Sequence, residues 1–364
     1  MKKIFSLITL CLIACATFAQ SDATLEKPYK KAKEQHGQDV IFLGTSPNWK
    51  YTISGSRDMT IKLWETDSLN PVQTFKGHIS AVQVVAMSND CKLMLSGSDD
   101  GSVILWDVEK GSIIQKVKNH QEGVNGLAFS PEASPKYFYT GGEDGKIQVY
   151  DRLTGCKFIN SIQTEGGGIM GMGIPFGSRN ALIICKDGKM REYDLKTGAL
   201  LRTFEGNHTE DVHQMVLSPD GKYAATCSDD KRIILWDIAA GKIDKTFEGH
   251  TWKVFSVAFN PTGQYIASTS IDGTVRMWNV ADGKELKQWK LKYTKQFNAV
   301  TFTADSRYVI AAIVHTPPVN EDFYWWSTGL DLPVPAPIAA MPEEATPVKV
   351  APKPVPGKKP IIKK

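Results

Sequence analysis

The feature that most constrains this chain is a spacing that recurs five times. A histidine is followed 22 to 24 residues later by an aspartate, and six residues after that by a tryptophan or tyrosine. The set recurs with a period of 42 to 44 residues, which is typical of a supersecondary unit stacked against copies of itself. The sets are His36, Asp58 and Trp64; His78, Asp100 and Trp106; His120, Asp144 and Tyr150; His208, Asp230 and Trp236; and His250, Asp272 and Trp278.

Each unit reads as strands. Residues 249–291 show the pattern most clearly: apolar side chains recur at a period of two in four runs, and Asn, Asp, Gly and Pro separate the runs. The runs cover residues 254–259, 265–268, 274–278 and 285–289. We therefore expect four short antiparallel strands per unit, joined by tight turns, in an all-β fold.

Two dipeptides point to a known repeat. Gly-His occurs at 77–78 and 249–250, and Trp-Asp occurs at 106–107 and 236–237, with looser versions in the other units. The chain thus resembles the WD40 repeat family of β-propellers over about residues 26 to 330. Residues 166–205 and 297–328 form two weaker units without the histidine. Counting them, the resemblance implies a propeller of seven blades over residues 25–330, and we expect it to be monomeric.

The last unit ends before a fourth strand, whereas Leu25–Lys33 precedes the first unit and has no blade of its own. Propellers of this family close their ring by letting an N-terminal strand complete the last blade. We therefore predict that Leu25–Lys33 pairs with the strand around Phe323–Ser327, which would leave only protected edges.

A hydroxyl accompanies every histidine. Four residues before each aspartate stands Ser54, Ser96, Thr140, Thr226 or Ser268, whereas the histidine-free unit has Ile183 there. This co-occurrence indicates one network, in which the aspartate and the hydroxyl contact the two imidazole nitrogens and the aromatic residue donates to the hydroxyl. The resemblance implies the same tetrad.

Ser, His and Asp also form hydrolase triads, but a nucleophile is needed once, near an oxyanion hole. We interpret the sets as structural, expect no catalytic, cofactor or metal residue, and predict a protein that is not an enzyme. The two units without histidine are expected to have the least constrained loops.

The N-terminus resembles an export signal. Lys2 and Lys3 precede an apolar run that is too short to span a membrane, and Thr17-Phe18-Ala19 suits cleavage before Gln20. A competing interpretation treats Leu12–Cys15 as a lipobox, with a lipid anchor at Cys15. We favour a signal peptide at residues 1–19 and a location in the periplasm or cell envelope of a bacterial-type cell; a cytosolic adaptor is the alternative.

Charge and cysteine usage exclude some functions. The chain has 43 Lys and Arg against 39 Asp and Glu, and without the signal and the basic tail the body is close to neutral. Such a body has no field to hold a nucleic acid. Cys91, Cys156, Cys185 and Cys227 remain after the signal, without Cys-x-x-Cys spacing, so we expect buried thiols or one disulfide, and no zinc site.

By resemblance, partners bind on the face formed by the loops before the first strands and the turns between second and third strands. Trp252 is the preferred anchor because it stands two residues after a structural histidine. The other candidates are Lys253, Phe255, His213, Gln83, Arg57, Asp99, Glu143 and Asp229. The long turn at 315–322 belongs to the same face. Trp49 replaces a turn glycine on the opposite face, where it either marks a second contact surface or folds back on its blade.

Residues 331–364 differ in composition from the rest. From Pro333 onward nine residues are proline, and lysine pairs close the segment. This composition predicts an extended, largely polyproline II tail.

The leading hypothesis is an exported interaction scaffold that binds a protein or peptide in the envelope. The second hypothesis is a propeller-based small-ligand binder or hydrolase.

Overall fold

In the computed structural model the described residues are 36–132, 134–175, 178–291, 296–314, 323–330 and 332. They contain 27 strands and no helix, so the prediction of an all-β fold is confirmed. The signal at 1–19, Cys15, the strand at Leu25–Lys33, the turn at 315–322 and the tail beyond 332 lie outside these residues.

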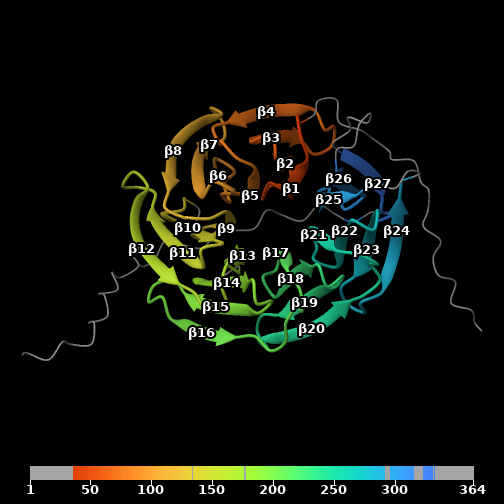
Figure 1. Ribbon diagram of the computed structural model, residues 1–364. Coiled ribbons are helices and arrows are strands. Elements are labelled where there is room, and N and C mark those ends of the chain that lie inside the picture. The colour runs from red at the N-terminus through yellow and green to blue at the C-terminus, as the bar shows by residue number, and fades with distance from the viewer. Residues whose placement is uncertain are drawn as a thin grey trace, which may run out of the picture.

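Figure 1 shows seven sheets arranged as blades around a central axis. Within each blade the strands follow one another in chain order, all antiparallel. The innermost strand of each blade comes first in the chain, and the fourth lies on the rim. The predicted seven-bladed propeller is therefore confirmed.

The blades are bounded as follows. Blade one has β1 (Val40–Thr45), β2 (Tyr51–Ser56), β3 (Thr60–Glu65) and β4 (Pro71–Lys76); blade two has β5 (Val82–Met87), β6 (Leu93–Ser98), β7 (Ser102–Asp107) and β8 (Ser112–Lys118). Blade three has β9 (Val124–Phe129), β10 (Tyr137–Gly142), β11 (Lys146–Asp151) and β12 (Lys157–Gln163); blade four has β13 (Ile169–Gly173), β14 (Asn180–Cys185), β15 (Met190–Asp194) and β16 (Leu200–Thr203). Blade five has β17 (Val212–Leu217), β18 (Tyr223–Ser228), β19 (Ile233–Asp237) and β20 (Lys242–Phe247); blade six has β21 (Val254–Phe259), β22 (Tyr265–Ser270), β23 (Thr274–Asn279) and β24 (Glu285–Lys290). Blade seven has β25 (Phe297–Phe302), β26 (Tyr308–Ile313) and β27 (Phe323–Ser327).

The core lies between neighbouring blades. Both faces of each sheet carry apolar side chains because each blade is covered by a blade on either side. The ring closes in the same way: Val40, Leu43 and Trp64 of blade one pack with Ile310, Phe323 and Trp325 of blade seven. Blade seven has three strands within the described residues, whereas the other blades have four.

Candidate functional site

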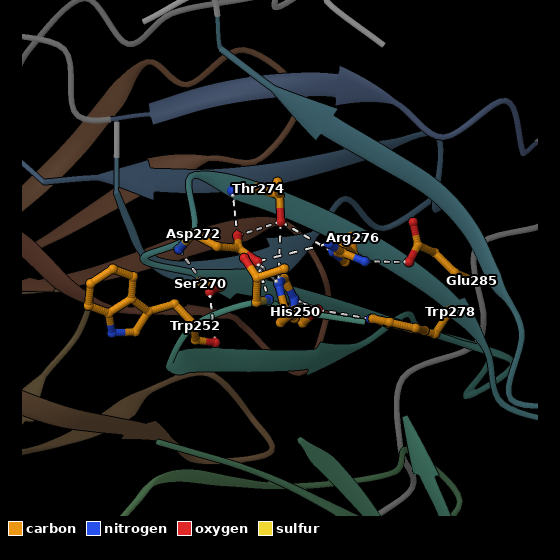
Figure 2. Close-up of polar contacts among 10 residues, drawn as sticks. His250, Trp252, Ser270, Asp272, Thr274, Arg276, Trp278 and Glu285 are labelled. Carbon is orange, nitrogen blue, oxygen red and sulfur yellow. Dashed lines mark hydrogen bonds and ion pairs between the residues drawn. The ribbon is translucent and has the colours of Figure 1, made fainter. Parts of the chain in front are cut away.

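The histidine network of blade six is complete (Figure 2). His250 Nδ1 lies 2.9 Å from Asp272 Oδ2, and His250 Nε2 lies 2.8 Å from Ser268 Oγ. The same Oγ accepts the indole N–H of Trp278 at 2.9 Å. With a neutral imidazole, Nδ1 donates to the carboxylate and Nε2 accepts from the hydroxyl. The bonds join the loop before β21 to the turn between β22 and β23.

Blades one and five repeat this arrangement. The corresponding sets are His36, Ser54, Asp58 and Trp64, and His208, Thr226, Asp230 and Trp236, with their three bonds between 2.7 and 3.0 Å. A further hydroxyl, two residues after the aspartate, was missed from the sequence: Thr60 and Thr274 each donate to their aspartate at 2.6 Å, and Ser102 of blade two contacts its histidine. An Asp-x-Thr pattern is the signal that marks it.

The networks hold loops and do not present a nucleophile. Ser54, Ser96, Thr140, Thr226 and Ser268 are fully buried. Burial lowers the pKa of His250 although Asp272 opposes the shift, so the imidazole is neutral at pH 7. Burial alone would raise the pKa of Asp272, but hydrogen bonds from His250 and Thr274 hold it well below its usual range. A buried hydroxyl that accepts an indole N–H has no access to a substrate.

Two of the five predicted networks are incomplete. In blade two, His78 Nδ1 lies 3.2 Å from Ser102 Oγ, and Asp100 Oδ2 is buried without a hydrogen-bond partner among the described residues. In blade three, the phenol of Tyr150 donates to Gln148 at 2.5 Å instead of bonding Thr140. The predicted contacts of Asp100 with its histidine and of Tyr150 with its hydroxyl are therefore wrong. A serine competes in the first case, and a phenol directs its donor differently from an indole in the second.

The rest of those two networks is present. His78 Nε2 lies 2.6 Å from Ser96 Oγ, which also accepts the Trp106 indole N–H at 2.8 Å. His120 lies 2.9 Å from Asp144 Oδ1 and 2.7 Å from Thr140 Oγ1.

Blade four lacks the histidine, but other contacts hold the loop that enters it. Arg191 donates to both carboxylate oxygens of Asp187, at 2.9 and 2.6 Å, from a nearly buried position. The amide of Glu165 donates to the Tyr193 phenol oxygen at 2.9 Å, which fixes the entering loop. The expectation that this loop is among the least constrained is wrong, because the ion pair between Arg191 and Asp187 replaces the imidazole.

Seven residues surround the channel at the loop face, and we call them the mouth ring. Each is the second residue of an innermost strand, and each falls at a β-bulge, where the register with the second strand shifts by one residue. A bulge redirects a side chain away from the regular alternation of the strand. All seven line a cavity of about 550 Å³; they are Ile41, Gln83, Asn125, Met170, His213, Phe255 and Asn298.

The mouth ring contains three predicted residues, Gln83, His213 and Phe255, together with four that sequence reasoning missed. The missed residues are Ile41, Asn125, Met170 and Asn298. In the five histidine-bearing blades the ring residue stands five positions after the histidine. That spacing is a signal from which Ile41 and Asn125 can be found.

The predicted residues just before the aspartates lie beside the mouth ring. Gln83 donates to Asp99 at 2.5 Å, Asn125 donates to Glu143 at 3.2 Å, and His213 Nε2 lies 2.5 Å from Asp229 Oδ1. Arg57 lines the cavity and lies 3.8 Å from Asp39. The structure thus gathers most of the predicted surface around one cavity.

Blades five and six are joined at this face. Lys253 of blade six forms an ion pair with Asp229 of blade five, and the ring of Phe255 lies 4.5 Å from that of His213. Burial alone would raise the pKa of Asp229, but hydrogen bonds from Lys253 and His213 lower it. The carboxylate therefore remains charged and holds the Lys253 ammonium and the His213 imidazole in place.

Trp252 lies apart from the cavity lining. Its side chain is 57% exposed and points away from the blade-six network (Figure 2). The backbone around it is fixed on both sides: Thr251 N donates to Asp272 at 3.0 Å, Ser270 Oγ donates to the Trp252 carbonyl at 3.2 Å, and Ile271 N donates to the Lys253 carbonyl at 3.2 Å. A large exposed indole is therefore held on a rigid loop.

Cys91, Cys156, Cys185 and Cys227 are free thiols. Burial raises the pKa of Cys185 to about 11, so it is not a reactive thiolate. Within the described ranges, no cluster of His, Cys, Asp or Glu is arranged to hold a metal ion. The same ranges contain no helix able to cross a membrane.

Comparison with known proteins agrees with this geometry. Residues 69–107, 111–151, 198–237 and 241–279 match the WD40 family model, described as WD domain, G-beta repeat. The chain therefore contains WD40 repeats, folded as a seven-bladed β-propeller.

Similar proteins include three from eukaryotes. Periodic tryptophan protein 2 homolog of Dictyostelium discoideum is 28% identical over 34% of this chain and 13% of its own length. Nuclear distribution protein PAC1 of Arthroderma otae is 27% identical over 61% of this chain and 41% of its own. WD repeat-containing protein SL1-17 of Schistosoma mansoni is 29% identical over 54% of this chain and 64% of its own. The chain thus spans less than two thirds of each of these relatives.

Proposed function

We propose that this protein is a non-enzymatic scaffold that binds a peptide or a partner domain on the loop face of its propeller. The relatives support the general class, because WD40 propellers typically mediate protein interactions. The observation that carries the proposal is the exposed indole of Trp252 on a loop fixed at three consecutive residues. Preorganised aromatic residues contribute strongly to binding because little conformational entropy is lost when they are covered.

Two further features support the loop face. Ile79, directly after the histidine of blade two, is 70% exposed, so a second large apolar side chain is offered to a partner. Asp99, Glu143 and Asp229 beside the mouth ring supply an acidic rim around a cavity with a mixed polar and apolar lining. A partner that covers Trp252 and inserts one side chain into the cavity would contact both the exposed indole and the rim of the cavity.

The test compares two exposed apolar residues on opposite faces. Leu153, in the turn between β11 and β12, is 59% exposed, nearly the same as Trp252. Mature wild-type protein, Trp252→Ala and Leu153→Ala are used to capture proteins from an extract of the source cells. We expect Trp252→Ala to lose the partners that wild type and Leu153→Ala recover. Equal recovery by all three proteins would exclude this surface.

The location is part of the proposal. The basic and apolar start of the chain and its Thr17-Phe18-Ala19 site support export to the periplasm or cell envelope, with cleavage before Gln20 or lipidation at Cys15. Cell fractionation tests it: recovery of the protein in the cytosol with an intact N-terminus would make it a cytosolic adaptor instead.

The cavity at the mouth ring favours a second candidate, a small-ligand binder. Its volume of about 550 Å³ lies in the usual range for small-molecule sites, and Gln83, His213 and Asn298 offer polar contacts among apolar ones. Native mass spectrometry of the purified protein tests it. A bound small molecule that is lost in His213→Ala but kept in Trp252→Ala would favour this candidate over the scaffold.

A further inference from the structure

The channel has a second cavity at its other end. This cavity, of about 370 Å³, is lined by the turns between first and second strands, on the face opposite the mouth ring. Its apolar lining includes Pro47, Trp49, Met87, Pro131 and Pro219. None of the described residues that line it is charged. The cavity is therefore suited to an uncharged, apolar occupant.

Trp49 lies in this lining at a conformational cost. Its φ is 60°, in the left-handed region, where the equivalent turn residues of blades five and six are Gly221 and Gly263, with φ of 68° and 73°. A bulky side chain in this region costs about 1–2 kcal/mol. The turn thereby places a partly buried indole in the lining of the channel opening.

The chain leaves the propeller on this same face. After β27, Thr328 N donates to the Arg307 carbonyl at 2.8 Å and Thr328 Oγ1 donates to the Ser306 carbonyl at 2.6 Å. Ser306, with φ of 58°, occupies in blade seven the turn position that Trp49 occupies in blade one. Blades seven and one pack against each other. The segment after residue 330 therefore begins one blade away from Trp49.

The composition of that segment matches the cavity. Residues 333–342 read Pro-Val-Pro-Ala-Pro-Ile-Ala-Ala-Met-Pro and carry no charge, whereas Glu343 and the lysines follow further along. Proline-rich segments favour polyproline II and bind grooves lined by aromatic residues with little loss of entropy. Ten such residues span about 30 Å. The third strand of a blade lies only about 10 Å from its innermost strand, so the segment is long enough to reach the channel.

We propose that residues 333–342 dock in the uncharged cavity and pack on Trp49. The lysines beyond residue 348 then remain in solvent and are not buried in the uncharged cavity. This docking is independent of the loop-face function, because the two faces share only Leu127 and Leu217 in their cavity linings.

The test uses the full-length chain with a photoreactive benzoylphenylalanine in place of Ile338, and a matched probe in place of Ile361. We expect the probe at 338 to cross-link within the same chain to peptides containing residues 45–50 or 87–89, and the probe at 361 not to do so. Trp49→Gly removes the indole and suits the positive φ, so it folds normally. It should lower the cross-link yield about tenfold, as expected for loss of an aromatic anchor.

Three outcomes would overturn the proposal. The first is equal labelling of these peptides from positions 338 and 361. The second is cross-linking of position 338 to a second copy of the chain or to another protein, which would assign the cavity to a different occupant. The third is a yield unchanged by Trp49→Gly. Amide exchange gives an independent readout: Ile338→Asp should speed exchange around residues 46–50, and equal rates would also contradict docking.

Discussion

Replacing Asp272 with alanine tests whether the histidine networks fix the loops. The carboxylate accepts hydrogen bonds from His250 Nδ1 at 2.9 Å, Thr251 N at 3.0 Å, Thr274 N at 2.9 Å and Thr274 Oγ1 at 2.6 Å. The variant leaves the buried His250 Nδ1 with only the Thr274 hydroxyl, at 3.3 Å, as a possible acceptor, and loss of the carboxylate costs about 1–3 kcal/mol by itself. Thr251 lies near the surface and is rehydrated, whereas the bonds to the Thr274 turn are also lost. We expect the free energy of unfolding to fall by about 3 kcal/mol.

Asp100 is the matched control, because it occupies the same position in blade two with fewer bonds. It accepts the Ser102 amide at 2.8 Å, while its Oδ2 has no hydrogen-bond partner within the described ranges. Asp100→Ala should therefore cost only about 1 kcal/mol. The predicted difference of about 2 kcal/mol corresponds to roughly a 30-fold difference in the unfolding equilibrium constant.

Urea unfolding followed by tryptophan fluorescence measures both variants, with m-values compared to establish that the same transition is observed. Hydrogen exchange at Thr251, Trp252 and Lys253 should also become faster in Asp272→Ala. Equal losses of stability in the two variants, or unchanged exchange at these three residues, would refute the interpretation that bond number sets the strength of each network.

Other predictions address protonation, closure and processing. Burial lowers the pKa of His78 to about 4. As the pH falls, His78 is therefore protonated at a higher pH in the unfolded chain than in the folded one. Stability should therefore decrease from about pH 6.5 to pH 4, by up to about 3 kcal/mol from this residue, and His78→Gln should flatten the profile; an unchanged profile in urea titrations would contradict this. Deleting residues 20–35 should lower the melting temperature sharply if an N-terminal strand completes blade seven, whereas an unchanged melt would argue against that closure. Mass spectrometry of the mature protein should find Gln20 at its N-terminus; a lipidated Cys15 would support the alternative processing.

The fold was predictable because its determinants are local and repeated. Period-two patterns, turn residues and the recurring His, Asp and aromatic positions all keep one phase from His36 to Trp278. Even the two units without histidine were recognisable from their third strands. Strand order then follows from short turns, which leave adjacent strands no other partner.

Details of the site were less predictable because they depend on competition and register. Asp100 follows the same Ser-Asp pair as Asp230, but the chain continues with Ser102 where blade five has Arg232, and Ser102 takes the place of the aspartate at the imidazole. Arg191 gave no motif, yet it replaces a histidine through a bidentate pair. The mouth ring follows from bulges, and a bulge is a property of how two strands pair, not of either strand alone.

The most direct test of the account is the affinity of a captured partner for Trp252→Ala, measured together with the unfolding free energy of the variant. The account predicts binding weakened by about 30-fold or more, as for loss of a hot-spot residue, with stability unchanged because the indole is exposed. Leu153→Ala should bind like wild type. Undiminished affinity in Trp252→Ala would contradict the central claim that the rigid loop face, anchored at Trp252, is where this propeller binds its partner.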